Sequence, residues 1–182
     1  GPFREGMKFL GWAQNGVRSY DGNNDGVAEN YDRDRWGVGL KYKRGNYRVT
    51  TEYMAGEGMI FVGPQNPSFG IGPGAGNPGG TGNGLLGKAS GWYLEGGWRI
   101  GSSNWELDLR YDTYNRLEDD RFEMDFDTWT AGVQYFFNKK TRVGLNYSAR
   151  DYKAANFPDG AGPNANLDGV DGRTAIQLTH IF

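Results

Sequence analysis

The sequence predicts an all-β fold, an antiparallel up-and-down transmembrane β-barrel in which eight strands are visible. Three observations predict it. Apolar and polar residues alternate with a period of two over segments of roughly 9–11 residues, the length of a strand that crosses a bilayer at a tilt. Aromatic residues stand near both ends of the apolar faces. Short and long connections alternate along the chain, as they do in outer-membrane barrels.

The composition is consistent with strands and loops. Only 37% of the 182 residues are hydrophobic, yet the chain contains 31 Gly, 11 Tyr, 10 Phe and 6 Trp. Mean hydropathy is -0.72 and no run of 18 apolar residues occurs, which excludes a transmembrane helix. Cysteine is absent, so disulfide scaffolds and thiolate metal sites are excluded. The net charge of -2 without a basic run argues against a nucleic-acid partner.

The first half of the chain contains three predicted strands. Residues 7–20 form a plausible strand whose two faces the pattern does not distinguish. Residues 35–43 alternate clearly, and a tight turn at 44–46 leads into a second alternating segment at 47–55. The following Gly-, Pro- and Asn-rich stretch, 62–88, has no regular pattern and is predicted to be a loop.

Five more strands follow in the second half of the chain. They are predicted at 91–100, 105–114, 127–137, 141–150 and 174–182. The short turns are 101–104 and 138–141, and the longer connections are 117–125 and 154–173. We expect a single domain over residues 1–182, either closed on itself or forming part of a larger barrel.

Alternation alone fits both a soluble barrel with an apolar interior and a membrane barrel with an apolar exterior. The position of the aromatic rings favours the membrane barrel. Trp92 and Trp98, for example, flank one apolar face at its two ends, as in the aromatic girdles at the two membrane interfaces. All short turns also fall on one side, like the periplasmic turns of outer-membrane barrels.

The ending TAIQLTHIF is similar to the C-terminal signature of bacterial outer-membrane proteins, in which a final Phe follows alternating apolar residues. That resemblance implies an outer-membrane location and recognition by the barrel-assembly machinery. The residues that match the signature are Ile176, Leu178, His180 and Phe182, with His180 a departure from the usual aromatic or apolar residue. The segment WTAGVQYFFNKKTRVGLNYSARDY resembles the late hairpin of the phosphate-selective porin O and P family.

The resemblance to this family implies a sixteen-stranded trimeric channel for anions. Eight strands are visible here, so we expect either a small self-closed barrel or the C-terminal half of a larger one. Charged residues on the polar faces are the candidate channel lining, because a filled eight-stranded interior would hold them only as a near-complete ion-pair network. They are Lys41, Lys43, Arg48, Glu52, Glu95, Arg99, Glu106, Asp108, Arg110, Asp112, Arg142 and Arg150.

Catalysis is not expected. His180 is the only histidine, and it falls on the lipid-side set of the last strand, far from any loop-side active site. Asp108 and Asp112 could act as a carboxylate pair, but two strand residues on a pore wall are more simply explained as lining.

The segment DGNNDGVAENYD after the first strand matches the first half of an EF-hand calcium loop. An ordinary Asp/Asn/Gly-rich loop is the alternative. The candidate ligands are Asp21, Asn23, Asp25, Val27 through its carbonyl, Glu29 and Asp32. The later stretch 164–169 repeats only the half-motif.

The sequence therefore predicts an outer-membrane porin for passive diffusion of small hydrophilic solutes. Seven lining cations against five carboxylates favour anions weakly. No dense ladder of Arg and Lys occurs, so phosphate selectivity is not predicted. The alternative is a non-conducting eight-stranded barrel that anchors or adheres through its loops. Expected partners are outer-membrane lipid, the assembly machinery, small solutes or anions, and two further copies in a homotrimer. No cofactor is required, and calcium is a candidate ligand of the loop after the first strand.

Overall fold

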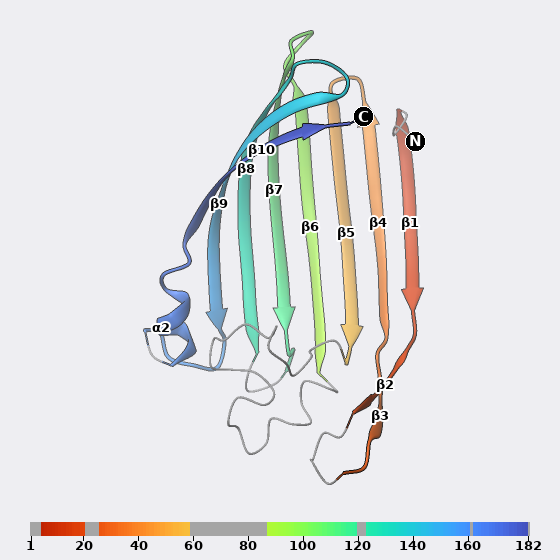
Figure 1. Ribbon diagram of the computed structural model, residues 1–182, viewed down its shortest axis with the longest axis vertical. Coiled ribbons are helices and arrows are strands. Elements are labelled where there is room, and N and C mark those ends of the chain that lie inside the picture. The colour runs from red at the N-terminus through yellow and green to blue at the C-terminus, as the bar shows by residue number, and fades with distance from the viewer. Residues whose placement is uncertain (1–4, 21–25, 59–86, 120–122, 161, 182) are drawn as a thin grey trace.

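The computed structural model describes residues 5–20, 26–58, 87–119, 123–160 and 162–181. Eight antiparallel strands form one up-and-down sheet in the order β1-β4-β5-β6-β7-β8-β9-β10 (Figure 1). The eight strands are β1 (Gly6–Gln14), β4 (Arg35–Arg44), β5 (Tyr47–Glu57), β6 (Lys88–Arg99), β7 (Trp105–Arg116), β8 (Met124–Phe136), β9 (Thr141–Ala154) and β10 (Gly172–His180). The predicted fold class is confirmed.

The sheet curls but does not close within the described part of the chain. β1 and β10 are its two edges, and neither pairs with the other. Figure 1 shows the curvature on the β9–β10 side, and β1 begins and β10 ends at the end of the sheet where the short turns are. In lipid, every strand edge needs a hydrogen-bonding partner.

Two smaller elements differ from the sequence-based prediction. The segment predicted as one strand at residues 7–20 is divided at Asn15 and Gly16, and its second part, β2 (Val17–Tyr20), pairs with β3 (Glu29–Asp32) in a separate two-stranded ladder. The connection 154–173 contains a short helix, α2 (Pro163–Leu167), with Pro163 in its first turn. No helix in the ranges that the structure describes is long and apolar enough to span a membrane.

The short turns are fixed by local hydrogen bonds. Gly45 takes a φ of 54° between β4 and β5, a conformation that glycine adopts without strain. Its backbone N–H donates to Glu5 at 2.8 Å. In the β8–β9 turn, the side-chain oxygen of Asn138 accepts from the backbone N–H groups of Lys140 and Thr141. These contacts set the strand register, and the register decides which side chains share a face.

One face of the sheet, here called the apolar face, is hydrophobic and exposed. Leu109 and Leu94 are 54% and 47% exposed. A row of contacting rings crosses this face on the side of the long connections, formed by Trp92, Tyr111 and Trp129, with centroid separations of 5.3 and 4.7 Å along the row. The same row begins with Trp36 and Tyr53. Rows of this kind are typical of the membrane interface.

A second row of rings crosses the apolar face on the side of the short turns. It includes the pairs Tyr47–Trp98 and Trp105–Tyr135, at 6.4 and 4.8 Å. On β6, Trp92 and Trp98 mark the two rows, six residues or roughly 20 Å of strand apart. The band between the rows is built mainly from aliphatic side chains such as Val38, Leu94 and Leu109, as in the lipid-facing belt of an outer-membrane barrel.

The buried core is small and lies beside α2. Met124, Ala154 and Leu167 are buried together, with Phe126, Tyr152 and Phe157 packed around them. Asn164 of α2 holds this region in place: its side-chain oxygen accepts from the N–H of Ala154 and its amide donates to the carbonyls of Ala154 and Phe157. The 154–173 connection is therefore anchored to the end of β9.

Candidate functional site: the polar face of the sheet

The opposite face of the sheet, here called the polar face, carries the charged side chains. Strand register places all twelve predicted lining residues on it. The cross-strand partners Lys43 and Arg48, Glu95 and Arg110, and Arg99 and Glu106 show this directly. The alternation in the sequence thus assigned the faces of β4 to β9 correctly, whereas the role of these residues in conduction stays a prediction.

Arg48 is the centre of the largest ion-pair network. Its guanidinium pairs with Glu95 on β6 and with Glu106 and Asp108 on β7, the bond from Nε to Glu106 measuring 2.9 Å. Its side chain is 31% exposed, and those of Glu106 and Asp108 are about half as exposed, at 15% and 14%. Gln134 also donates to Asp108. One arginine therefore holds three partly buried carboxylates together.

Arg48 reaches β7 because the residue between them has no side chain. Gly97 of β6 lies directly opposite Arg48 in the register. A Cβ atom on Gly97 would come within 2.5 Å of Arg48 Nε and within 2.9 Å of its Cζ. The guanidinium thus lies flat across Gly97, and this glycine is part of the site.

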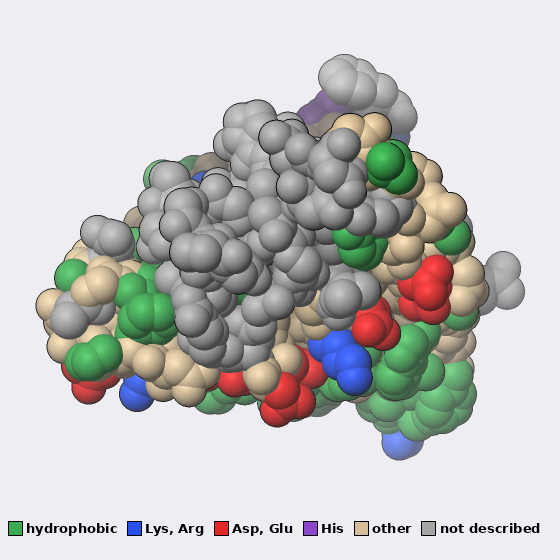
Figure 2. Space-filling model, turned by 90° about the horizontal axis from the view of Figure 1, so that it is seen from below, with side chains coloured by type: hydrophobic (Ala, Val, Ile, Leu, Met, Phe, Trp, Pro, Cys, Tyr) green, Lys and Arg blue, Asp and Glu red, His purple; other side chains and the backbone are tan. Residues whose placement is uncertain are grey.

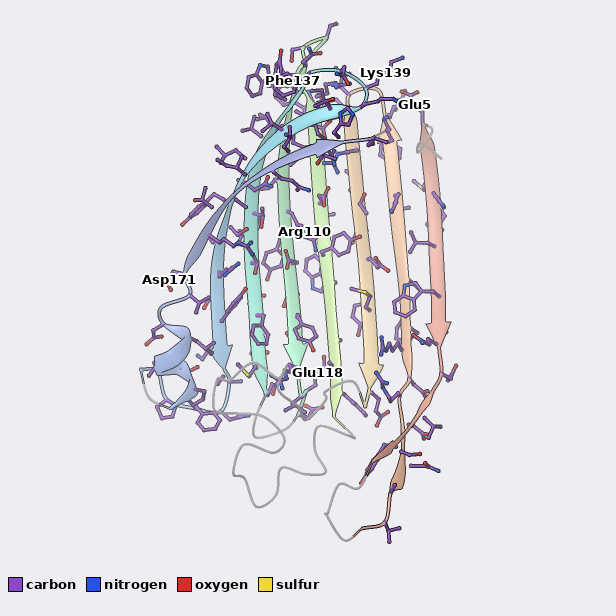
Figure 3. The ribbon with its side chains drawn as sticks, viewed as in Figure 1. Glu5, Arg110, Glu118, Phe137, Lys139 and Asp171 are labelled. Carbon is purple, nitrogen blue, oxygen red and sulfur yellow. The ribbon has the colours of Figure 1, made fainter. Side chains whose placement is uncertain are left out.

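A second, smaller network surrounds Arg110 at the middle of the face (Figure 3). Arg110 pairs with Asp112 at 3.1 Å and with Glu95 at 3.6 Å. Its guanidinium lies 4.1 Å from the centroid of the Tyr93 ring. The hydroxyl of Tyr93 donates to Glu52 at 3.4 Å, so this network joins β5, β6 and β7.

The remaining five predicted cations form no ion pair with a described residue, and four of them lie on strands to either side of the carboxylates. Lys41 and Lys43 are on β4, and Arg142 and Arg150 are on β9. The guanidiniums of Arg99 and Arg142 instead lie over the ring of Phe136, at 4.5 and 6.0 Å. All five carboxylates of the face are on β5 to β7, together with three of the seven predicted cations, so the centre of the face has a net negative charge and β4 and β9 carry only positive charge on this face.

The register adds charged residues that the sequence did not assign. Lys8 of β1 is the direct partner of Lys41, and Arg35 of β4 is the partner of Gly56. Arg116 of β7 and Arg173 of β10 are also on the polar face. The described strands add no carboxylate to this face. Lys8 was missed because the pattern of β1 is ambiguous: its apolar residues Leu10 and Trp12 lie on the polar face.

Acidic side chains also gather at the end of the sheet with the long connections, around Glu118 (Figure 3). Burial raises the pKa of the Glu123 carboxyl, and the charges of Asp125, Asp119 and Glu118 raise it further. Figure 2 looks onto this end and shows acidic and basic side chains beside a patch of hydrophobic ones. The described residues contain no group of three side chains that could hold a metal ion.

Of the predicted calcium ligands, Asp21, Asn23 and Asp25 lie outside the described residues. Val27 is 63% exposed, Asp32 ends β3 opposite Val17, and the side chain of Glu29 is not described. Calcium in this loop stays a prediction.

The residues of the predicted assembly signal lie on the apolar face of the edge strand β10. Ile176 and Leu178 are 76% and 70% exposed, and His180 contacts the hydroxyl of Thr141 through Nδ1 at 2.9 Å. Phe182 lies outside the described residues. Recognition by the assembly machinery stays a prediction.

Comparison with known families decides the class of protein. Residues 13–167 match the family described as phosphate-selective porin O and P. The chain belongs to this family. No curated protein matches the sequence. Family membership makes this porin a channel-type protein of the outer membrane, and the sheet with its exposed apolar face is the architecture that such a protein requires. The family points to a channel rather than an enzyme.

Proposed function

We propose that this porin is a passive diffusion channel whose polar face prefers small anions. The observation that carries the proposal is the charge on that face. Three cations that are not buried, Lys8, Arg35 and Arg173, join the seven predicted ones, against the same five carboxylates. Arg116 has the same facing but is only 5% exposed. Four of the five carboxylates pair with Arg48 or Arg110, which they neutralise, and the fifth, Glu52, accepts hydrogen bonds from Trp12 and Tyr93.

The peripheral cations support an aqueous lining. Lys8 and Lys41 are directly opposite each other in the ladder, and like charges in that position repel. Such a pair is tolerable where water and mobile anions screen it, and it is costly in a dry interior. Anions passing along β4 or β9 would meet this uncompensated positive charge, and selection by lining charge is a general property of pores.

The outer-membrane channel requires partners for the open edges of β1 and β10, because lipid offers none to the backbone. These partners are either each other or further strands. The proposal also includes assembly as a homotrimer and calcium binding by the loop after the first strand.

The proposal predicts the sign of the zero-current potential in a planar bilayer. Refolded protein is inserted into a bilayer that separates concentrated from dilute KCl, a salt whose two ions have similar mobility in water. An anion-preferring channel passes chloride toward the dilute side, so the concentrated side should become positive. The opposite sign would contradict the anion preference alone, whereas a silent bilayer would contradict the channel and favour the non-conducting barrel.

A further inference from the structure

A hollow of about 430 Å³ lies on the polar face, in the half of the sheet nearer the long connections. Residues of five strands line it, among them Trp12 of β1, Arg35 of β4, Met54 of β5, Tyr93 of β6, and Arg110, Asp112 and Tyr114 of β7. Its volume is within the range of small-molecule sites, roughly 300–1,000 Å³.

The aromatic wall of the hollow is held in a fixed orientation. The indole of Trp12 donates to Glu52 at 2.9 Å and lies against Gly37, where a Cβ atom would come within 2.7 Å of the indole nitrogen. Trp12 nevertheless remains 39% exposed. Glu52 also accepts from Tyr93, so it positions both rings. Exposed rings held in this way are prepared to bind a ligand at a low entropic cost.

Besides the cation Arg35, the polar groups of the hollow include a donor and an acceptor that neutralise each other. Arg110 and Asp112 pair at 3.1 Å, with side chains 37% and 36% exposed. An anion gains little from an arginine already paired with two carboxylates. A neutral hydroxyl can accept from the guanidinium and donate to the carboxylate, and so it uses both.

We infer that this hollow is a binding subsite for a neutral saccharide ring. The C–H face of a pyranose is apolar and rigid and can pack on Trp12 and Tyr114, while its hydroxyls reach the Arg110–Asp112 pair. A flat aromatic ligand would leave that pair unused, and an open-chain polyol has no rigid face for the rings. The inference rests on the proposed function only in requiring that water reaches this face.

Saturation-transfer NMR with maltose tests the inference on protein refolded in a detergent without a sugar head group. Wild-type protein should show saturable transfer, strongest at the ring C–H protons of the sugar. Trp12→Ala should weaken the affinity by about tenfold or more, the effect of removing a central aromatic contact. Trp36→Ala is the matched control, because this tryptophan lies at the same end of the sheet on the apolar face.

Tyr114→Leu gives a second test, since this substitution leaves Glu52 and its hydrogen bonds intact, and far-UV circular dichroism verifies the folding of each variant. Mannitol, an open-chain polyol, should give no saturable transfer. Absence of saturable maltose binding, or equal binding by the Trp12 and Trp36 variants, would overturn the inference. Binding of inorganic phosphate that displaces maltose would do so as well, by assigning the hollow to anions. Because no conductance is measured, failure here is separate from failure of the channel.

Discussion

Replacing Lys41 and Lys43 with Glu should reverse or abolish the anion preference of the channel. Both lysines lie on the polar face, and neither has a carboxylate partner among the described residues, so their charge acts on passing ions. The double substitution changes the local charge by four. We expect the chloride-to-potassium permeability ratio to fall on the order of 3- to 10-fold at 0.1 M KCl, and less at 1 M, where the Debye length shrinks from about 10 to about 3 Å.

The control variant changes the total charge of the protein by the same amount, but in a turn and not on the polar face. Lys139, labelled in Figure 3, and Lys140 are exposed in the turn between β8 and β9. Lys139→Glu with Lys140→Glu should alter the permeability ratio much less. If both double variants shifted it equally, the net charge of the protein and not the lining of β4 would set the selectivity.

Replacing Arg48 with Met should destabilise the barrel more than any other single charge removal on the polar face. The substitution leaves Glu95, Glu106 and Asp108 close together without their shared cation. The network is partly exposed, so we expect a loss of about 2–3 kcal/mol in the free energy of unfolding, below that of a fully buried pair. The midpoint of urea unfolding in lipid vesicles measures it. Arg142→Met removes the same charge without exposing carboxylates and should cost less.

Gly97→Ala tests the same network without changing a charge. The added methyl group would meet the Arg48 guanidinium, so the side chain must leave its position over β6. Gly96 is the matched control, because a Cβ atom there has nothing within 4 Å. Gly96→Ala should leave stability unchanged or slightly raised. Equal stability of the two alanine variants would show that Arg48 does not depend on crossing Gly97.

The sequence predicted the strands and faces of β4 to β9 because polar and apolar residues must alternate in a strand with only one face in water, whichever way the apolar face points. It did not predict the facing of β1, since Phe9 and Leu10 are adjacent apolar residues on opposite faces. Trp12 therefore entered no candidate site, although its hydrogen bond to Glu52 makes it part of the polar face. The helix α2 was missed because five residues are too few for a helical period, and a buried amide, Asn164, holds it in place.

The residues of the lining were predictable, but their pairing was not. Alternation places Arg48 and Asp108 on one face without saying that they meet across an intervening strand. That contact depends on the register of three strands and on a glycine at one position. The excess of cations was underestimated for the same reason, because Lys8 and Arg173 acquire their facing only by pairing with β4 and β9.

The central claim is that the polar face lines water and the apolar face meets lipid. The chain has no cysteine, so a single introduced thiol reports its own surroundings. Thr130 and Ala131 are neighbours on β8 with opposite facing: Thr130 contacts the Ser148 hydroxyl, and Ala131 lies between Leu109 and Tyr147. Each is replaced by Cys, and the channel is exposed to a charged methanethiosulfonate in a planar bilayer.

Thr130→Cys should react with the reagent and lose current, and Ala131→Cys should remain unmodified with its current intact. If Ala131→Cys reacted and Thr130→Cys did not, water would reach the apolar face, and the central claim would be contradicted.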